Sequence, residues 1–456
     1  TNYITNFDFL NQYLPDTYEK EFERYGNRTV SSFLRMVGAE MPSNSDLIKW
    51  AEQGRLHTKY VNCTTTAAAG DNSATISVLD TLTPGTGAIA VRAGQTVMLS
   101  DNAGTGSNKG IVTAVNTAAG TFDVAFYEAA GQAFGIAAVA SVFIYGSEFK
   151  KGTEGMIGSL EADDNIFENS PIIIKDKYAV SGSDMAQIGW VEVTTENGSS
   201  GYLWYLKSEH ETRLRFDDYL ETAMIEAVPA EAGSGAATAA TNPTYGNKGS
   251  EGVFYVVGNR GNIWAGGNPD SLAQFDSIVS RLDKQGAIEE NVVFVDRDFG
   301  FDIDDMLAGL NGYSSTGAAN FASFGLFDND KDMALNLGFT GFRRGYDFYK
   351  SDWKYLNDPT MRGDMSGVTG SGRINGLLVP AGSTSVYDQI LGKNAKRPFL
   401  HVRYRASETE DRRYKTWITG SAGGAQTSSL DAMEVHFLSE RAVCTLGANN
   451  FFLFSE

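Results

Sequence analysis

The last apolar run of the chain constrains the fold more than any other feature. The chain has 456 residues and closes on "SERAVCTLGANNFFLF", Ser439–Phe454, with only two residues after it. Chain ends usually fray and are polar, because few contacts hold them in place. This end carries three phenylalanines and a leucine over 451–454. The pattern therefore predicts a terminal strand that is buried when the chain folds.

Composition and charge exclude several classes of function. The formal net charge is -19 at pH 7, so a broad grip on DNA or RNA is not expected, because Lys and Arg supply most of the affinity for phosphates. No run of about 18 apolar residues is present, which argues against a membrane span. The start shows no basic segment ahead of an apolar core, so we expect no signal peptide. The only cysteines, Cys63 and Cys444, make a disulfide framework improbable and fit synthesis in a reducing cytosol.

The first third of the chain has two parts of different composition. Residues 1–56 mix charged and apolar side chains, and we expect a helical arm that lies on another surface, because it is too short for a core of its own. Between Val61 and Gly146 there are only seven charged residues among Thr, Ala, Gly and Val. Alternating runs such as "ATISVL" and "TFDVAF" are separated by glycine-rich turns. They predict a small antiparallel barrel or sandwich inserted into a host domain.

A long extended segment precedes a long helix. Ser147–Val193 is polar and extended, with one strong strand signal at Ile172–Ile174. Long loops of this kind are generally functional. Leu203–Val228 has apolar residues near helical spacing, and Pro229 ends the pattern. At about 1.5 Å per residue the helix is nearly 40 Å long, which predicts a spine across which other elements pack.

The second half of the chain alternates between helix and strand signals. The run "VFYVV" predicts a strand, and the next helix is expected to begin at Asn268 with Pro269 in its first turn and to end at Gly286. "NVVFVD" predicts another strand, followed by a short helix with Asp302 as its N-cap. Further strands are expected at "GLLVP", "PFLHVRYRA", "RRYKTWIT", "AMEVHFL", "AVCTLG" and "NFFLF". The last three lie close enough to form a terminal meander or a sheet return.

Two acidic clusters contain carboxylates at spacings found in metal or acid–base sites. Asp328, Asp330 and Asp332 have the first spacings of a calcium loop, but Met333 and Phe339 stand where glycine and a bidentate glutamate are needed, which favours a solvated turn. In "VDRDFGFDIDD" the carboxylates have a spacing that suits acid–base work or metal-assisted hydrolysis. Helix capping is the favoured interpretation, with Asp304 and Asp305 in the first turn after Asp302. The four histidines are isolated, so we predict no catalytic residue, metal or cofactor.

Charged residues suggest two contacts between copies of the chain. The segment "RYRASETEDRRYKTWIT" predicts a hairpin whose tip is either solvated or part of a symmetric contact in which each copy offers both signs. The tip residues are Glu408, Glu410, Asp411, Arg412 and Arg413. If the tip is a contact, reversing the two arginines weakens assembly with little effect on folding. A second hypothesis pairs Lys150 and Lys151 with Glu209 or Glu211 of a neighbouring copy.

The order of these elements resembles the major capsid proteins of tailed double-stranded DNA bacteriophages, which have the Hong Kong 97 fold. The stretches that carry the resemblance are the long helix before Pro229, "DSLAQFDSIVSRLDKQGA…NVVFVD" and the ending "VHFLSERAVCTLGANNFFLF". The segment "SPIIIKDKYAVSGSDMAQIGWVEV" is similar to capsid proteins of crAss-like phages. The resemblance covers nearly the whole chain outside Val61–Gly146. It rests on the order of the elements and on the residue patterns of these stretches, without an invariant motif.

The resemblance implies an α+β fold of the Hong Kong 97 type, with a division of the chain into named parts. The implied parts are an N-terminal arm, 1–56; an extended loop, 57–200, with an all-β insertion domain, 61–146; a peripheral domain with the spine helix, 201–250, and a β-hairpin, 396–438; and an axial α/β domain, 251–395, with its closing strand, 439–456. The charged helical scaffold that some members fuse ahead of the arm is not seen. No Lys–Asn crosslink pair is evident.

The resemblance also implies a function without catalysis. The chain is expected to assemble into hexamers and pentamers of an icosahedral phage head that encloses double-stranded DNA. Its partners are its own copies, a portal, a scaffold and decoration or auxiliary proteins, with packaged DNA only a weak non-specific neighbour. The location implied is the virion capsid, assembled in the cytoplasm of a host bacterium. The alternatives are the shell of a cellular nanocompartment, an Asp-dependent hydrolase and a secreted β-rich adhesin.

Overall fold

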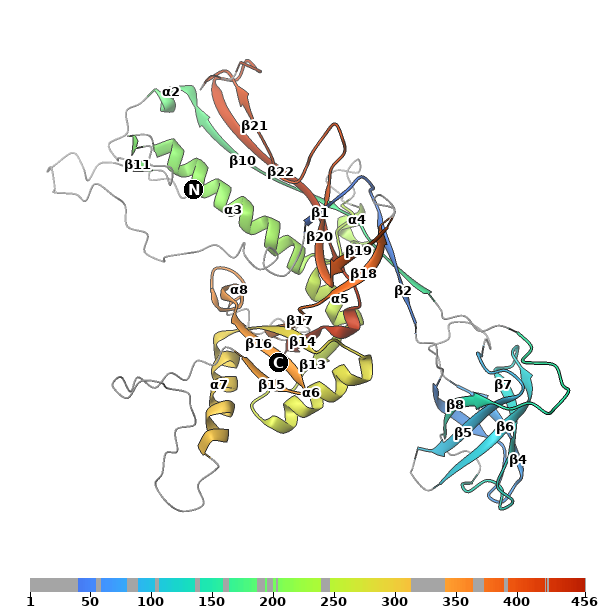
Figure 1. Cartoon of the computed structure of the whole chain (residues 1–456). Helices are drawn as coiled ribbons and strands as arrows, with labels where there is room; N and C mark the ends of the chain where they lie inside the picture. The colour runs from blue at the N-terminus through green and yellow to red at the C-terminus, as the bar shows by residue number, and fades with distance from the viewer. Residues whose placement is uncertain are drawn as a thin grey trace. The chain divides into compact units, whose positions relative to one another are not determined.

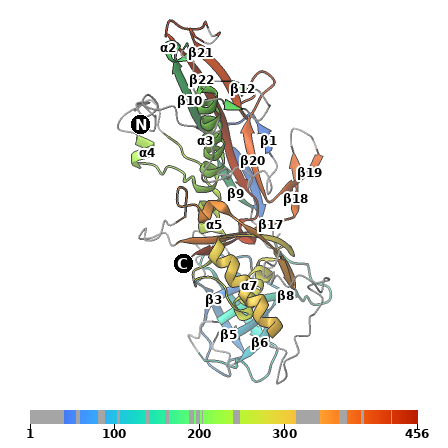
Figure 2. The same cartoon turned by 90° about the vertical axis from the view of Figure 1, so that its left-hand side faces the viewer.

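The computed structural model contains two compact units, one drawn from residues 1–50 and 168–456 and the other from residues 51–167 (Figures 1 and 2). The first unit combines mixed sheets with helices, and the second is all β. Within the described residues, no helix is both long and apolar enough to cross a membrane. The structure describes residues 40–54, 59–79, 89–102, 106–135, 140–158, 164–186, 193–194, 200–201, 204–238, 247–312, 341–363, 373–388, 393–422, 424 and 426–455.

One sheet of the first unit is built around its longest strand, β22, which runs for 14 residues. Along one edge β22 pairs with β10 over ten residues. Along the other edge it pairs first with β20 and then with β21, and β1 adds to β20 in parallel. The bounds are β1 Glu40–Ser43, β10 Ile172–Ser181, β20 Leu400–Arg405, β21 Lys415–Gly420 and β22 Ala432–Thr445. The strand predicted at Ile172–Ile174 is thus the start of β10.

A helix of 23 residues, α3 (Trp204–Glu226), packs along this sheet (Figure 1). Phe216 and Leu220 are its buried side chains there, and they contact the sheet through one continuous core. The sheet residues of this core are Tyr178, Val180, Met433, Val435 and Phe437. The long helix predicted from the spacing of apolar residues is confirmed, with ends one and two residues inside the predicted ones.

The second sheet of the first unit has six strands in the order β13-β23-β17-β14-β16-β15. Helices α6 and α7 pack on one face, where Phe275 and Phe299 are fully buried. The other face packs against α5, α8 and the end of α3. The bounds are α5 Val253–Arg260, β13 Asn262–Trp264, α6 Leu272–Gln285, β14 Glu290–Val295, α7 Arg297–Gly312, β15 Gly341–Arg344, β16 Tyr346–Asp352, α8 Lys354–Asn357, β17 Ile374–Pro380 and β23 Phe452–Ser455.

The chain closes on β23, an interior strand of the six-stranded sheet. It pairs in parallel with β13 on one side and antiparallel with β17 on the other. Phe452 and Phe454 point to one face and are 0% and 1% exposed, while Leu453 joins the core on the other face. The prediction of a buried terminal strand is therefore confirmed.

The second unit contains a closed barrel of six strands in the order β3-β4-β7-β6-β5-β8. Its core holds side chains such as Ile76, Val97, Phe122 and Val142, all at most 2% exposed. Of the two all-β forms left open by the sequence, the structure has the barrel. The bounds are β3 Lys59–Thr65, β4 Ser73–Val78, β5 Gln95–Asp101, β6 Ser107–Asn116, β7 Thr121–Phe126 and β8 Ala140–Ser147.

A two-stranded ribbon carries the chain into the barrel and back. The chain enters through β2 and returns through β9, and these strands pair with each other. The bounds of the ribbon strands are β2 Ile48–Gln53 and β9 Asp164–Asn169. The other short elements of the chain, which are not part of the ribbon, are α2 Gly182–Met185, β11 Val193–Thr194, β12 Ser200–Gly201, α4 Gly235–Thr238, β18 Ser383–Asp388, β19 Lys393–Pro398 and the 3-10 turn Ala448–Asn450. Asn169, at the base of the ribbon, bonds the carbonyls of Glu251 and Val443 at 3.0 and 2.7 Å.

Two predictions of secondary structure are wrong, and one of the two arrangements expected at the chain end is excluded. The run "VFYVV" is the first turn and a half of helix α5, because a short apolar run does not distinguish a buried strand from a buried helix. The run "AMEVHFL" and the first four residues of "AVCTLG" belong to one strand, β22, since the polar residues between them stay in the ladder. Of the two arrangements expected at the chain end, no meander forms, because β22 and β23 belong to different sheets. The chain instead returns to the six-stranded sheet, where β23 pairs with β13 and β17.

Two predicted helix starts are also wrong, and one predicted end is confirmed. Helix α6 begins after Ser271, whose N–H bonds Gln274 Oε1 at 3.3 Å, so Asn268 is not the N-cap. Helix α7 begins at Arg297, five residues before Asp302, and Asp296 Oδ1 accepts the Phe299 N–H at 2.7 Å. Residues directly before the two helices, Ser271 for α6 and Asp296 for α7, take the cap positions. Gly286 ends α6 with a φ of 69°, which glycine adopts without strain.

His401, in β20, is predicted to make stability fall at acid pH. Its ring is buried, and Nδ1 lies 3.2 Å from the Pro398 carbonyl oxygen. Burial lowers the pKa of His401 from 6.5 to about 4, and the charges of Arg403 and Arg397 act in the same direction. Because the unfolded chain takes up this proton first, the stability is complete above pH 6.5 and is lost as the pH falls toward about 4.

The expected loss is on the order of 3 kcal/mol across that window. Urea denaturation between pH 7 and pH 4 measures it, by comparing the wild type with His401→Gln. The variant is expected to show a shallower fall. His210→Gln, at an exposed position of α3, is the matched control and keeps the wild-type slope. An unchanged slope in His401→Gln contradicts the prediction.

Candidate assembly surface

Three polar residues lie buried in the middle of β22. Ser439, Glu440 and Arg441 are 0%, 6% and 6% exposed, although they follow and precede apolar residues of the same strand. Strands pair with β22 on both edges at or beside this point, so the three residues lie inside the sheet and not at its border. Buried charges are costly unless they are paired and hydrogen-bonded. Ser439, Glu440 and Arg441 therefore form, together with the residues that pair with them, a polar cluster inside the sheet.

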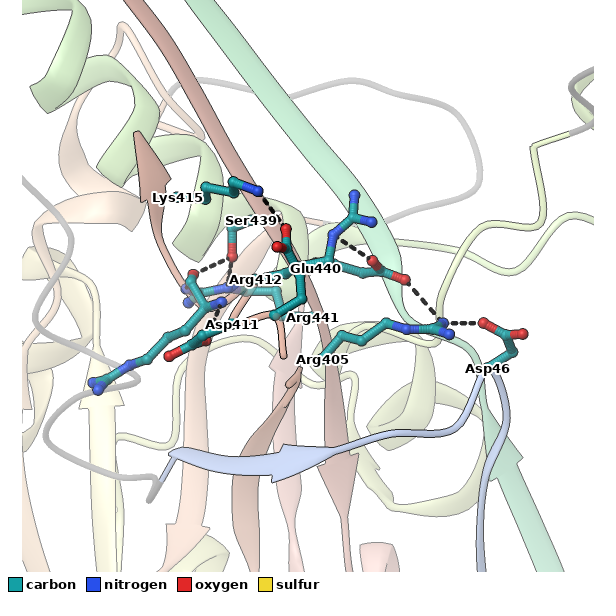
Figure 3. Close-up of polar contacts among 10 residues, drawn as sticks. Asp46, Arg405, Asp411, Arg412, Lys415, Ser439, Glu440 and Arg441 are labelled. Carbon is teal, nitrogen blue, oxygen red and sulfur yellow. Dashed lines mark hydrogen bonds and ion pairs between the residues drawn. The ribbon is translucent and has the colours of Figure 1, made fainter. Parts of the chain in front are cut away.

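Glu440 lies between two guanidinium groups (Figure 3). Arg405 Nη1 is 3.3 Å from Glu440 Oε1, and Arg412 Nε is 3.0 Å from Oε2. Arg405 also pairs with Asp46, and this hydrogen bond lowers the pKa of Asp46. The carboxylate of Glu440 thus joins β22 to the segment after β20 and, through Arg405, to the chain between β1 and β2.

Arg441 anchors the other side of the cluster. Its Nε donates to Ser439 Oγ at 2.9 Å, and its Nη2 donates to the Arg413 carbonyl oxygen at 3.0 Å. Its Nη1 lies 3.5 Å from Glu40 Oε1, and Glu40 also forms an ion pair with the Arg413 side chain. Strand β1 has only four residues, so these ion pairs and the parallel ladder to β20 hold it in place.

The charged residues predicted at the tip of a long hairpin lie instead in a short turn between β20 and β21. The Ser407 N–H donates to the Glu410 carbonyl at 2.8 Å, and the Arg412 N–H donates to the Arg405 carbonyl at 2.9 Å. Strands β20 and β21 do not form one long hairpin, because both pair with β22 along the same edge. The long hairpin is β21–β22, and its connection, 421–431, has Asp431 as its one charged residue.

The residues of the turn divide into an exposed group and a paired group. Glu408 and Asp411 are exposed, and Glu410 pairs with Lys415, which lowers the pKa of Glu410. Arg412 pairs with buried Glu440, and Arg413 pairs with Glu40 of the same chain. The premise that both arginines belong to exposed pairs is therefore wrong for Arg412, and we now expect its reversal to affect folding. A contact between copies through this turn stays a prediction.

The second predicted contact involves residues of both compact units. Lys150 and Lys151 follow β8 and are exposed. Glu209 and Glu211 lie on α3, where Glu209 is half-buried and Glu211 is exposed. All four positions are at least partly accessible to another molecule. Their pairing across two copies stays a prediction.

Sequence reasoning missed the sheet face that α3 leaves uncovered. There the Trp417 ring stacks on His436 at 5.1 Å, and Lys415 Nζ lies 5.9 Å from the Trp417 ring. Lys177 pairs with Glu434 on the same face at 3.0 Å. A hollow on this face is lined by Glu410, Arg412, Lys415, Trp417 and Leu438. The alternation of Lys415, Trp417 and Thr419 in "KTWIT" is the signal that places them on one face.

Carboxylates of the acidic cluster 296–305 cap a helix or pair with residues of the same chain. Asp296 caps α7 and pairs with Arg373 at 2.9 Å, while burial raises the pKa of Asp296. Asp304 pairs with Lys350 at 2.6 Å, and Asp302 accepts a hydrogen bond from Asn268 at 2.7 Å. In the described part of the chain, no three His, Cys, Asp or Glu residues are grouped to hold a metal. The candidate calcium loop, 328–339, lies outside the described residues.

Comparison with known proteins gives similarity of fold only. No protein-family model matches the chain, and no curated protein matches it. A structure from Microbacterium phage Oxtober96 is similar at 11% identity and TM-score 0.41, over 98% of this chain and 97% of that chain. The mature capsid of bacteriophage PhiM1 is similar at 11% identity and TM-score 0.34, over 68% and 78%. The capsid of cyanophage A-1(L) is similar at 10% identity and TM-score 0.37, over 68% and 84%. The last two are phage capsids, the class of protein that the sequence resembles.

Proposed function

We propose that this chain is the repeating subunit of an icosahedral phage head that encloses double-stranded DNA. Hexamers and pentamers of the chain form the shell, and the chain performs no catalysis. The observation that carries the proposal is the ribbon of β2 and β9. It pairs with no further strand among the described residues, and it displays an apolar side chain, Ile166, that is 68% exposed.

A two-stranded ribbon is at best marginally stable alone in water. Ile48 and Trp50 secure the base of this ribbon against the first unit, but Ile166 has no such cover. A second chain that packs on the ribbon removes Ile166 from water and stabilises the pairing. A protein that exposes such a segment is suited to assembly, because every copy presents the same uncovered apolar surface to its neighbours.

The sheet face away from α3 is a suitable surface for the ribbon of a neighbouring copy. It presents Lys175, Lys177 and Lys415 beside Trp417, which is 36% exposed, and Ile173, which is 51% exposed. Residues 161–168, which include most of β9, hold four acidic side chains and no basic one. Opposite charges with apolar side chains between them favour contact in one register. Pairing of Lys150 or Lys151 with Glu209 or Glu211 of a neighbouring copy is a separate proposed contact, which a charge swap with recovered shell yield tests.

The proposal assigns each part of the chain a place in the shell. Residues 1–56 form the arm, 57–200 the extended loop with the 61–146 barrel inserted, 201–250 and 396–438 the peripheral domain, and 251–395 and 439–456 the axial domain. The net charge of -19 keeps the attraction between the shell and the DNA phosphates weak, so that packaged DNA can move along the inner surface. A portal, a separate scaffold and decoration proteins complete the head, which assembles in the bacterial cytoplasm.

Ile166→Asp is expected to abolish assembly while leaving the subunit folded. The side chain is exposed, so the effect on the free energy of unfolding is within about 0.5 kcal/mol. A buried carboxylate at a contact between copies costs far more. Sedimentation velocity is expected to show large particles for the wild type and small species for the variant. Asn165→Asp adds the same charge at the neighbouring exposed position and controls for charge alone.

Particles of Ile166→Asp that match the wild type in size contradict the role of the ribbon. Nuclease-protected DNA in particles from infected cells separates a phage head from a nanocompartment shell, since only the former packages the genome.

A further inference from the structure

An aromatic face lies on the outside of the barrel. Phe143 and Tyr145 occupy alternate outward positions of β8, and Tyr127 follows β7; their exposed fractions are 42%, 46% and 49%. On the same strand Val142 points inward and is fully buried, as the two-residue period of a strand requires. Large exposed aromatic groups on neighbouring strands are a surface that monomeric proteins rarely leave in contact with water.

Pairing across the strands shows that these residues form one surface. Met98 of β5 lies opposite Phe143 of β8 on one side and Lys109 of β6 on the other. Lys109 Nζ lies 5.8 Å from the centre of the Tyr145 ring, and the Tyr127 N–H bonds the Lys109 carbonyl at 3.0 Å. The surface therefore runs without a break across β8, β5, β6 and the end of β7.

The rim of this aromatic face carries both signs of charge. Lys59 of β3 lies opposite Phe143 and is exposed. On the other side, the Tyr127 hydroxyl donates to Glu148 Oε2 at 2.5 Å, and Glu128 accepts from Asn108 at 3.0 Å. Burial and the neighbouring Glu148 raise the pKa of Tyr127 to about 12.

We propose that this face, Met98, Lys109, Tyr127, Phe143 and Tyr145, is a contact through which the barrel of one copy binds the same face of a second copy. A two-fold contact needs a self-complementary surface, and a face with Lys59 at one end and Glu148 beside Tyr127 at the other provides it. Aromatic residues and methionine at the centre with polar groups around them are the composition of protein interfaces.

The charge of the barrel favours a second copy over other partners. Residues 59–147 carry three cationic and five acidic side chains, a formal charge of -2, although the whole chain carries -19. The barrel therefore carries little net charge to oppose contact with the barrel of a second copy. Three cationic side chains are too few to bind the phosphates of a nucleic acid. The inference rests on the proposed function, because a shell is what holds barrels of different copies close together.

Single cysteines in the full-length chain test the contact. Phe143 and Tyr145 are exposed, whereas the native Cys63 and Cys444 are 0% and 2% exposed, so the native thiols are expected not to react in the folded protein. With a short bis-maleimide crosslinker, Phe143→Cys and Tyr145→Cys are expected to give covalent dimers at least about tenfold faster than Thr117→Cys, because the contact raises the local concentration of the second thiol. Thr117 is exposed in the turn between β6 and β7 and is the matched control.

The outcomes separate this inference from the proposed function. Electron micrographs of the same samples report whether shells form. Shells with crosslinking no faster than that of Thr117→Cys overturn the barrel contact and leave the shell function intact. Fast crosslinking without shells supports the contact and counts against the shell. Slow crosslinking without shells overturns both.

Discussion

Phe452→Ala is expected to lower the free energy of unfolding by about 3–5 kcal/mol, the largest effect of any single truncation proposed for this chain. Phe452 is 0% exposed in β23, which lies between β13 and β17. Its ring stacks on Phe454 at 5.4 Å and faces the core under α6 and α7. Truncation leaves a cavity in the middle of a sheet whose strands on both sides are fixed, so little of the space can close.

Urea denaturation of the unassembled chain measures the loss, as a shift of the midpoint at unchanged slope. Phe301→Ala is the matched control, because Phe301 lies on α7 and is 56% exposed, so its truncation is expected to change stability by less than about 0.5 kcal/mol. If Phe452→Ala does not fold, Phe452→Leu retains most of the volume and gives a smaller, measurable loss. A change for either Phe452 variant as small as that of Phe301→Ala contradicts a buried terminal strand.

Arg412→Glu is expected to destabilise the subunit by on the order of 2–3 kcal/mol, before any effect on assembly. The change removes the guanidinium 3.0 Å from the Glu440 carboxylate and places a second carboxylate beside it. The Glu440 side chain is only 7% exposed, so water cannot replace the lost partner. Arg405 remains at 3.3 Å and limits the loss. Urea denaturation again measures the effect.

Glu408→Arg separates folding from assembly at this turn. Glu408 is exposed, so the substitution is expected to leave the free energy of unfolding within about 0.5 kcal/mol of the wild type. If the turn contacts a neighbouring copy, Glu408→Arg slows shell formation while the subunit stays folded. Normal shell formation by Glu408→Arg shows that the turn is only solvated. Wild-type stability of Arg412→Glu contradicts the role given to the Glu440 cluster.

The sequence predicted the elements whose apolar pattern is long and regular. The spine helix and helix α6 repeat apolar residues at helical spacing over many turns, and Gly286 marks a helix end by its backbone freedom. The terminal strand was predictable because three phenylalanines near a chain end have no stable place in water. The barrel strands were predictable because alternation and glycine turns recur along 61–146.

The sequence failed where the structure depends on residues far apart in the chain. The triplet 439–441 looks like a polar break between two strands, yet partners such as Glu40 and Arg405 allow it to remain within β22. These partners lie 401 and 35 residues away, and no local pattern reports them. The face formed by Trp417 and His436 likewise depends on the register of β21 against β22. Pairing of strands across the chain therefore decides the candidate assembly surface.

Electron microscopy of the purified full-length chain is the most direct test of the shell function. The proposal predicts closed particles of uniform diameter, built from rings of six and five subunits, either for the chain alone or after a separate scaffold is added. A population of single chains at every concentration, with and without the scaffold, contradicts it.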